Sequence, residues 1–331
     1  MTTDDIPIYT NISYALSEIL ARITVPLFYM ISGFLFFYKP EIFTPTVYQQ
    51  KLKKRGRSIL IPYIFWNAIV LALYFLVEMF FRDLLSGNSK MISDYTLKDI
   101  LWAFWDKDQI IQQNSSPEAM HMPINYPLWF IRDLMAVILV SPSIHWIILR
   151  TKSSIVWGMG VLWFFDWELN IPGLNITSFF FFTTGAYFAI ERINFIERFN
   201  RILKLSVALY LLTSLIDLIF RDTTWVSYIH KAGIGIGIIA IIAVVSEGIK
   251  RGKWHNVPLL SNSSFFIYAY HAMPLAFISK FLFKLLKPQS DWIILMLYLL
   301  CPFMIITIGI LIYWGMQKIL RRFTSAITGG R

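Results

Sequence analysis

The chain alternates long apolar stretches with short polar ones almost to its C-terminus. Most apolar stretches run for roughly 17–25 residues, the length that an α-helix needs to cross a bilayer. Strands of a membrane barrel would instead show about ten residues of alternating polarity. The pattern predicts nine membrane spans, at Tyr14–Tyr38, Ile59–Phe81, Leu128–Leu149, Ser153–Trp167, Ile176–Ile190, Leu205–Phe220, Ala232–Ile249, Asn262–Phe283 and Trp292–Met316.

The composition agrees with this pattern. Of the 331 residues, 56% are hydrophobic and 15% are charged, which is too apolar for a soluble domain of this size. We therefore predict an all-α fold, a polytopic transmembrane helix bundle that forms one integral-membrane domain over residues 1–331. Residues 82–127 form a long outer loop within it. The single cysteine, Cys301, lies inside the last span, so no intrachain disulfide can form.

Basic residues gather in alternate connections between the spans. Segments 39–57, 150–152, 191–204, 250–253 and 318–331 hold 19 of the 30 Lys and Arg residues. Connections rich in Lys and Arg stay in the cytoplasm, so the C-terminus is expected there and, with nine spans, the N-terminus outside. Topology thus accounts for the net charge of +10, and nucleic acid is not an expected partner.

Arg22 lies near the start of the apolar run Ala21–Phe37. A guanidinium inside a membrane helix normally faces the protein interior or a water-filled cavity, and it marks a functional site. The alternative is that Arg22 lies close enough to the outer end of its helix to reach the lipid headgroups.

A cluster of basic residues precedes the second span, at Lys51, Lys53, Lys54, Arg55 and Arg57. It belongs to segment 39–58, which Pro40 and Pro62 bound and which we expect to be a cytoplasmic loop. One interpretation is that the cluster only keeps this loop inside. The other is that some of its cations bind a polyphosphate at the membrane face.

The outer connection at 82–127 is unusually long, which is typical of a functional loop, here one able to cover a sugar-sized acceptor. Its Leu97–Trp105 portion is expected to be an interfacial helix. Arg132 and Asp133 follow about one turn inside the outer end of the third span. As neighbours in a helix, they are expected to point to different faces.

Two other spans carry polar residues. Residues 183–185 form a small-residue patch suited to close helix contact. In the eighth span, Ser264, Tyr268 and His271 are spaced to share one helix face. A membrane histidine serves either as a hydrogen-bond partner between helices or as a functional group. Pro274 is expected to loosen the helix beside His271.

Five segments over nearly the whole chain carry a family resemblance: ARITVPLFYMISGFLFF, the basic run before LIPYIFW, PLWFIRDLMAVILVSP, FFFFTTGAYFA and SSFFIYAYH. In this order they resemble the acyltransferase 3 family of bacterial inner-membrane proteins, in particular its small O-acetyltransferase branch that acts on surface glycans. The resemblance implies a ten-helix bundle that moves an acyl group, usually acetyl from cytosolic acetyl-CoA, to a sugar hydroxyl. It implies no bound cofactor. The expected partners are acetyl-CoA, a surface or lipid-linked saccharide and membrane lipid.

The sequence departs from the family pattern in two places. Family members begin with a helix that carries an arginine and, about three turns later, a histidine assigned to catalysis, and nothing before Thr2 corresponds to it. We therefore expect that the chain begins one helix late and that activity depends on that helix. The family's Arg-x-x-Arg pair is also imperfect, because either Lys54 with Arg57 or Arg55 with Ser58 fits its spacing.

Acyl transfer from a thioester to an alcohol needs a base, donors for the oxyanion and a grip on the donor's phosphates. The resemblance implies that Arg55 and Arg57, with Lys54, bind the CoA phosphates. His271 with Tyr268 is expected to assist proton movement.

Arg22 and Arg132 are expected to stabilise charge or to hold an anionic lipid-linked sugar. Two rival interpretations remain. One is that the bundle exports a saccharide or an acyl group without chemistry. The other is that the chain is an inactive member, or a subunit that needs a partner.

Overall fold

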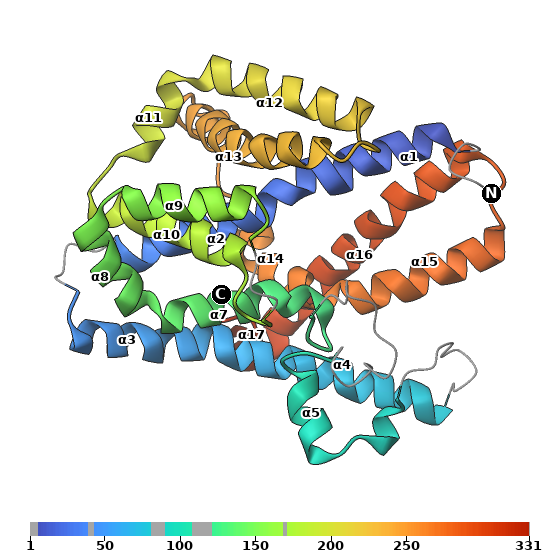
Figure 1. Cartoon of the computed structure of the whole chain (residues 1–331). Helices are drawn as coiled ribbons and strands as arrows, with labels where there is room; N and C mark the ends of the chain where they lie inside the picture. Colours follow the sequence, from blue (N-terminus) through green and yellow to red (C-terminus); the bar gives the residue numbers. More distant parts are fainter. Residues whose placement is uncertain (1–5, 39–42, 81–89, 108–120, 168–170, 331) are drawn as a thin grey trace.

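The computed structural model describes residues 6–38, 43–80, 90–107, 121–167 and 171–330. Within these ranges the regular secondary structure is helical, and no strand occurs (Figure 1). The predicted all-α fold is therefore confirmed.

Four helical runs are long and apolar enough to cross a membrane: Pro7–Phe37, Pro45–Phe80, α13 (Val226–Lys250) and α16 (Asp291–Ile319). Three bent helix pairs raise the number of candidate spans to as many as seven, by length and composition. The two remaining predicted spans coincide with α9 (Ser154–Phe164) and α10 (Ile176–Ile190), which have 11 and 15 residues. Both are shorter than the roughly 20 residues of a full crossing. Length thus supports seven spans at most in the described ranges, and not nine.

The bent pairs are α7 (Trp129–Leu139) with α8 (Ser141–Thr151), α11 (Phe195–Arg201) with α12 (Leu203–Ile219), and α14 (Pro258–Tyr270) with α15 (Ala272–Leu286). Shorter elements are η6 (Ile92–Asp94), α5 (Leu97–Ala103), η8 (Tyr126–Leu128) and α17 (Arg321–Ile327). Helices α12 and α13 lie side by side, and α15 runs back along α16 (Figure 1).

The first helical run changes its pitch without breaking. It comprises α1 (Pro7–Tyr14), the π-helical η2 (Ala15–Leu20), the 3₁₀ turn η3 (Ala21–Ile23) and α2 (Thr24–Phe37). Pro26 has no N–H group to donate to the carbonyl four residues earlier. The irregular turns directly precede this proline, so the missing donor accounts for them.

The basic segment before the second span is helical. α3 (Pro45–Arg55), η4 (Gly56–Leu60) and α4 (Ile61–Phe80) form one continuous run. Thr44 caps its start, with Pro45 in the first position, where an N–H group is not needed. The expectation of a loop over 39–58 is therefore wrong from residue 45 onwards. The expectation rested on Pro62, which lacks a backbone N–H donor and bounds the predicted loop. The π-helical turn η4 precedes this proline, and the helix continues through it.

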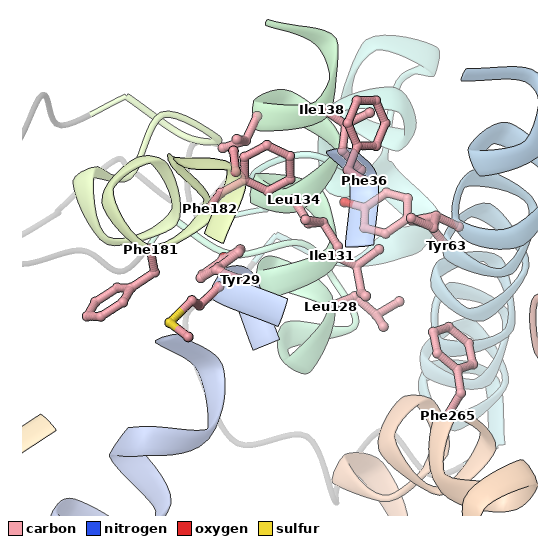
Figure 2. Packing of buried hydrophobic residues seen from close by; sticks show 14 of the residues in the cluster. Tyr29, Phe36, Tyr63, Leu128, Ile131, Leu134, Ile138, Phe181, Phe182 and Phe265 are labelled. Carbon is pink, nitrogen blue, oxygen red and sulfur yellow. The ribbon is translucent and has the colours of Figure 1, made fainter. Parts of the chain in front are cut away.

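Helices α2 and α10 pack closely against each other. A Cβ atom built on Gly33 would lie 2.0 Å from the carbonyl oxygen of Phe182, and one built on Gly185 would lie 1.9 Å from that of Met30. The two backbones therefore touch at both glycines, and the close contact predicted for the small-residue patch is confirmed. Buried aromatic and aliphatic side chains surround this crossing (Figure 2).

Candidate active site

A pocket of about 740 Å³ opens where the α3–α4 run meets α17. It is lined by Gln50, Lys53, Lys54, Arg57, Ser58, Ile61, Arg322, Ser325, Ala326, Gly329 and Gly330. Four of these residues are basic and none is acidic. Cations gathered in a concave site concentrate a positive potential, so we refer to this site as the basic pocket and expect it to attract phosphate groups.

Two of the three predicted phosphate-binding residues line the basic pocket. Lys54 and Arg57 do so, whereas Arg55 is not among the lining residues. Spacings of three and four residues place Lys53, Lys54 and Arg57 on neighbouring positions of one helix face, and Arg55 lies outside that pattern. Sequence analysis named Lys53 only as a member of the basic cluster, and it did not single out Arg322. For Arg322 the only signal was the basic composition of its segment.

The C-terminal segment is held against the α3–α4 run by a side-chain hydrogen bond and by a close backbone approach. The indole N–H of Trp66 donates to the carbonyl of Ile327 over 3.0 Å. Gly329 has a φ of +76°, and a Cβ atom there would lie 2.2 Å from the carbonyl oxygen of Ser58. Because only glycine tolerates both conditions, Gly329 lets α17 close one wall of the basic pocket and so places Arg322 there.

Arg132 and Asp133 of α7 form an ion pair in the protein interior. Their side chains are 4% and 1% exposed, and Nε of Arg132 lies 2.9 Å from Oδ1 of Asp133. The prediction that these neighbours point to different faces is therefore wrong, because the long arginine side chain folds back onto the carboxylate next to it. Burial of either charge without its partner would be strongly unfavourable.

The outer connection predicted over 82–127 is described at 90–107 and 121–127. The helix expected in its first part is present as α5. The segment packs against the bundle, since the hydroxyl of Tyr63 on α4 donates to the carbonyl of Phe104. Whether the connection covers an acceptor stays a prediction.

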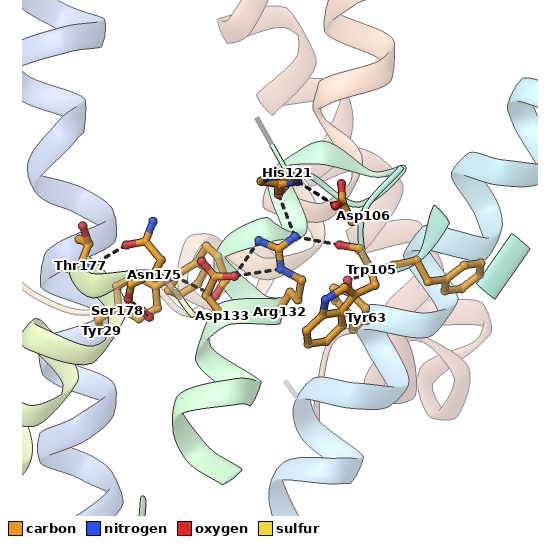
Figure 3. Close-up of polar contacts among 12 residues, drawn as sticks. Tyr29, Tyr63, Trp105, Asp106, His121, Arg132, Asp133, Asn175, Thr177 and Ser178 are labelled. Carbon is orange, nitrogen blue, oxygen red and sulfur yellow. Dashed lines mark hydrogen bonds and ion pairs between the residues drawn. The ribbon is translucent and has the colours of Figure 1, made fainter. Parts of the chain in front are cut away.

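Arg132 joins this outer connection to α7. Its Nη1 donates to the carbonyls of Trp105 and His121, each over 2.8 Å (Figure 3). Its guanidinium also lies 5.7 Å from the centre of the Trp105 ring, within cation–π range. One buried side chain thus holds two backbone stretches that flank residues 108–120.

His121 and Asp106 form a second polar pair beside Arg132 (Figure 3). Nδ1 of the imidazole lies 2.8 Å from Oδ2 of the carboxylate, and the two side chains are 16% and 0% exposed. Sequence analysis singled out neither residue as a site. They are fifteen positions apart in a polar connection, where no helical spacing relates them.

Tyr268 and His271 lie at the junction of α14 and α15. The hydroxyl of Tyr268 donates to the carbonyl of Pro127. Nδ1 of His271 donates to the carbonyl of Tyr268 over 2.8 Å, which leaves Nε2 to accept a proton. The 68° bend here confirms that Pro274 loosens the helix, because proline cannot donate to the carbonyl of Tyr270.

Arg22 lies on the surface of the described structure. Its side chain is 54% exposed and pairs with Glu18, which is 40% exposed, over 2.5 Å. The described structure therefore does not place this guanidinium in the protein interior, which was one of the two environments expected for it. Arg22 is not among the residues that line the basic pocket.

Comparison with known proteins gives one relative and one family. The chain is 30% identical over 135 residues to the succinoglycan biosynthesis protein ExoH of Rhizobium meliloti (strain 1021). The aligned part is 41% of this chain and 32% of that protein, so the chain spans about a third of the relative's length. No solved structure matches the chain. Residues 1–314 match the acyltransferase domain that defines the acyltransferase 3 family, and the chain therefore belongs to this family.

Proposed function

We propose that this multi-pass membrane protein is an O-acyltransferase that moves acetyl from cytosolic acetyl-CoA to a hydroxyl of a surface or lipid-linked saccharide. Membership of an acyltransferase family supports the reaction class, and the relative named for succinoglycan biosynthesis supports a glycan acceptor. The observation that carries the choice of donor is the basic pocket, which four cations and no carboxylate line.

The basic pocket fits a donor with several phosphates. Coenzyme A carries a diphosphate and a separate phosphate on its ribose, so it needs several cations in one place. Arg57 and Arg322 are each able to hold a phosphate through two parallel N–H bonds, while Lys53 and Lys54 add point charges. The volume of about 740 Å³ also falls within the range of roughly 300–1,000 Å³ that is typical of small-molecule sites.

The basic pocket belongs to the side of the protein that the charge distribution assigns to the cytoplasm. Its cations come from segments 39–57 and 318–331, two of the five connections rich in Lys and Arg. Acetyl-CoA is a cytosolic metabolite, so donor and pocket lie on the same side. This placement supports a bacterial inner-membrane protein with its C-terminus in the cytoplasm.

The interior offers groups for the transfer step itself. His271 presents Nε2 as a proton acceptor, and Tyr268 lies beside it. Three N–H bonds of Arg132 end on protein oxygens, so we assign this residue to positioning rather than to the oxyanion. Arg22 is assigned no contact with the substrate.

The proposal is tested by removing the pocket's guanidinium groups. Arg57→Gln and Arg322→Gln are combined in membrane vesicles supplied with labelled acetyl-CoA and an extract of lipid-linked glycans. Each lost charge-assisted phosphate contact weakens binding by roughly 1.5–3 kcal/mol, so we expect KM for acetyl-CoA to rise on the order of a hundredfold or more. Label in saccharide together with released CoA thiol distinguishes acyl transfer from export.

Two single variants serve as controls. Arg198→Gln removes an exposed charge from another basic segment and should leave KM unchanged. Arg55→Gln removes a neighbouring charge that does not line the pocket, so its effect should be smaller than that of Arg57→Gln. An unchanged KM in the double variant would show that the cluster serves topology alone.

A further inference from the structure

The four cations of the basic pocket are available to a ligand. Lys53, Lys54, Arg57 and Arg322 all line the pocket and are exposed. Within the described part of the chain, none of these side chains forms an ion pair or a hydrogen bond. Like charges three and four residues apart on one helix repel each other, so this arrangement lowers stability unless an anion binds. The pocket is therefore suited to a ligand that carries several negative groups.

One wall of the basic pocket lies outside the part of the chain that matches the family. The match covers residues 1–314, and α17 begins at Arg321. The segment is packed against the bundle, since Thr324 and Ile327 are buried. It contributes to the pocket lining Arg322, Ser325, Ala326, Gly329 and Gly330. Its contribution to the pocket is therefore not supplied by the matched domain.

The contacts of this segment give the order of the cations along the pocket. The segment runs antiparallel to the α3–α4 run. Gly329 lies against the backbone of Ser58, whereas the rings of Phe323 and Phe65 pack edge to face, with centroids 5.5 Å apart. Arg322 directly precedes Phe323. It therefore belongs to the end of α17 that lies further along α4.

The two lysines lie at the other end of the pocket. Lys53 and Lys54 belong to α3, about one helical turn before Arg57. From Lys54 to Phe65 the helical run rises by about 16 Å, at 1.5 Å per residue. The basic pocket thus has a lysine end, formed by Lys53 and Lys54, and an arginine end, formed by Arg57 and Arg322.

Coenzyme A carries its phosphates in a fixed order. The diphosphate joins the ribose to the arm that ends in the thioester, and the ribose phosphate lies on the far side of the diphosphate from the sulfur. From the arginine end, α4 leads into the apolar part of its span, whereas the lysine end lies in a segment that the charge distribution assigns to the cytoplasm. A donor whose thioester reaches the membrane domain therefore has its diphosphate at the arginine end.

The side chains at the two ends suit this direction. A guanidinium forms parallel N–H bonds to phosphate oxygens, so two of them can hold a diphosphate between the walls. A phosphate monoester carries nearly two charges, which two neighbouring ammonium groups balance. We propose that the basic pocket binds CoA in one direction, with the ribose phosphate on Lys53 and Lys54 and the diphosphate between Arg57 and Arg322. The inference rests on the function proposed above.

The test compares CoA with dephospho-CoA, which lacks only the ribose phosphate. Their Kd values are measured by titration calorimetry on the purified protein in a neutral detergent. The unaltered protein should bind CoA roughly 10- to 100-fold more tightly, because charge-assisted contacts to one phosphate are at stake. Lys53→Gln combined with Lys54→Gln should abolish this preference. Arg57→Gln combined with Arg322→Gln should weaken both ligands by a similar factor and keep the preference.

Two further variants sharpen the result. Arg321→Gln removes a charge beside Arg322 that does not line the pocket, so both Kd values should stay within about twofold of the starting protein. Arg322→Lys keeps the charge without the planar fork. Its affinity for both ligands should therefore lie between those of Arg322→Gln and the unaltered protein.

Two outcomes would overturn the inference. One is the reverse pattern, in which the arginine double variant loses the preference for CoA and the lysine double variant weakens both ligands equally. The other is equal binding of CoA and dephospho-CoA by the unaltered protein. Acyl transfer is measured separately in membrane vesicles. If the Kd values follow the expected pattern but no transfer occurs, the proposed function fails, whereas the direction of CoA binding stands.

Discussion

The arginine–carboxylate pairs Arg132–Asp133 and Arg22–Glu18 both lie within apolar helical runs, and their surroundings are opposite. Arg132 and Asp133 are 4% and 1% exposed, whereas Arg22 and Glu18 are 54% and 40% exposed. The guanidinium of Arg132 also bonds to two backbone carbonyls of another segment. That of Arg22 hydrogen-bonds only with Glu18 among the described residues.

The difference shows what a charge in a membrane helix indicates. Both arginines stand out equally in the sequence, since each interrupts an apolar run. Only Arg132 connects parts of the chain that are distant in sequence, because its donors reach Trp105 and His121. A local pair one helical turn apart, such as Arg22 with Glu18, mainly neutralises its own helix.

The largest effect is expected from removing the buried guanidinium. Arg132→Gln leaves Asp133 buried without its counter-charge, and such a loss typically lowers the free energy of unfolding by about 3–5 kcal/mol. Arg22→Gln should change it by less than about 1 kcal/mol, as for other exposed pairs. Chemical unfolding in detergent, followed by tryptophan fluorescence, measures both. Equal losses would mean that burial does not separate the two pairs.

A smaller effect is expected from the other partner. Asp133→Asn keeps an oxygen that accepts from Arg132, and the guanidinium keeps both carbonyls, so we expect a loss of about 1.5–3 kcal/mol in the same unfolding measurement. Glu18→Gln is the matched control and should stay near zero. In the variant with both Arg132→Gln and Asp133→Asn, the loss should be less than the sum of the single losses. Strict additivity would argue against a coupled pair.

The smallest effect is expected at a third pair, Lys90 with Asp99, at the start of α5. Here the hydrogen bond from Lys90 holds the pKa of Asp99 well below its usual range, and Thr96 adds to this as the helix cap. A lowered folded-state pKa means that the stabilisation is present above the unfolded value of about 3.9 and is lost as the pH falls through the folded value.

The α5 amides should therefore exchange faster, because Asp99 becomes protonated, only below about pH 4. The Asp99→Asn variant should not show this acid dependence. The comparison made is between the two proteins at each pH, which cancels the intrinsic exchange rate. Loosening of α5 near pH 6 in both proteins would point to a titrating group other than Asp99.

The sequence was sufficient to predict features that depend on residues close together in the chain. Arg132 was visible as a charge in an apolar run, and Gly185 as part of a small-residue patch in an aromatic helix. Pro274 was visible as a helix breaker beside His271. Each of these depends on neighbours within a few residues, so composition and spacing were sufficient.

The remaining features depend on contacts between distant residues. Arg322 reaches the basic pocket only because Gly329 lets the backbone approach Ser58. His121 meets Asp106 because Arg132 gathers the stretches that carry them. The helix through the basic segment was missed for a local reason, since a proline can be absorbed by a π-helical turn as well as end a helix.

The crossing of α2 and α10 has a consequence for biogenesis. At 15 residues, α10 is about 22 Å long, against roughly 30 Å of hydrocarbon, so it is a weak signal for insertion on its own. Its backbone fits directly against Gly33 of α2, which the ribosome completes well before α10 emerges. Helix α2 thus acts as a template that must remain unoccupied during synthesis of the intervening chain. A bulkier residue at position 33 should therefore first impair the membrane insertion of α10, which is synthesised much later.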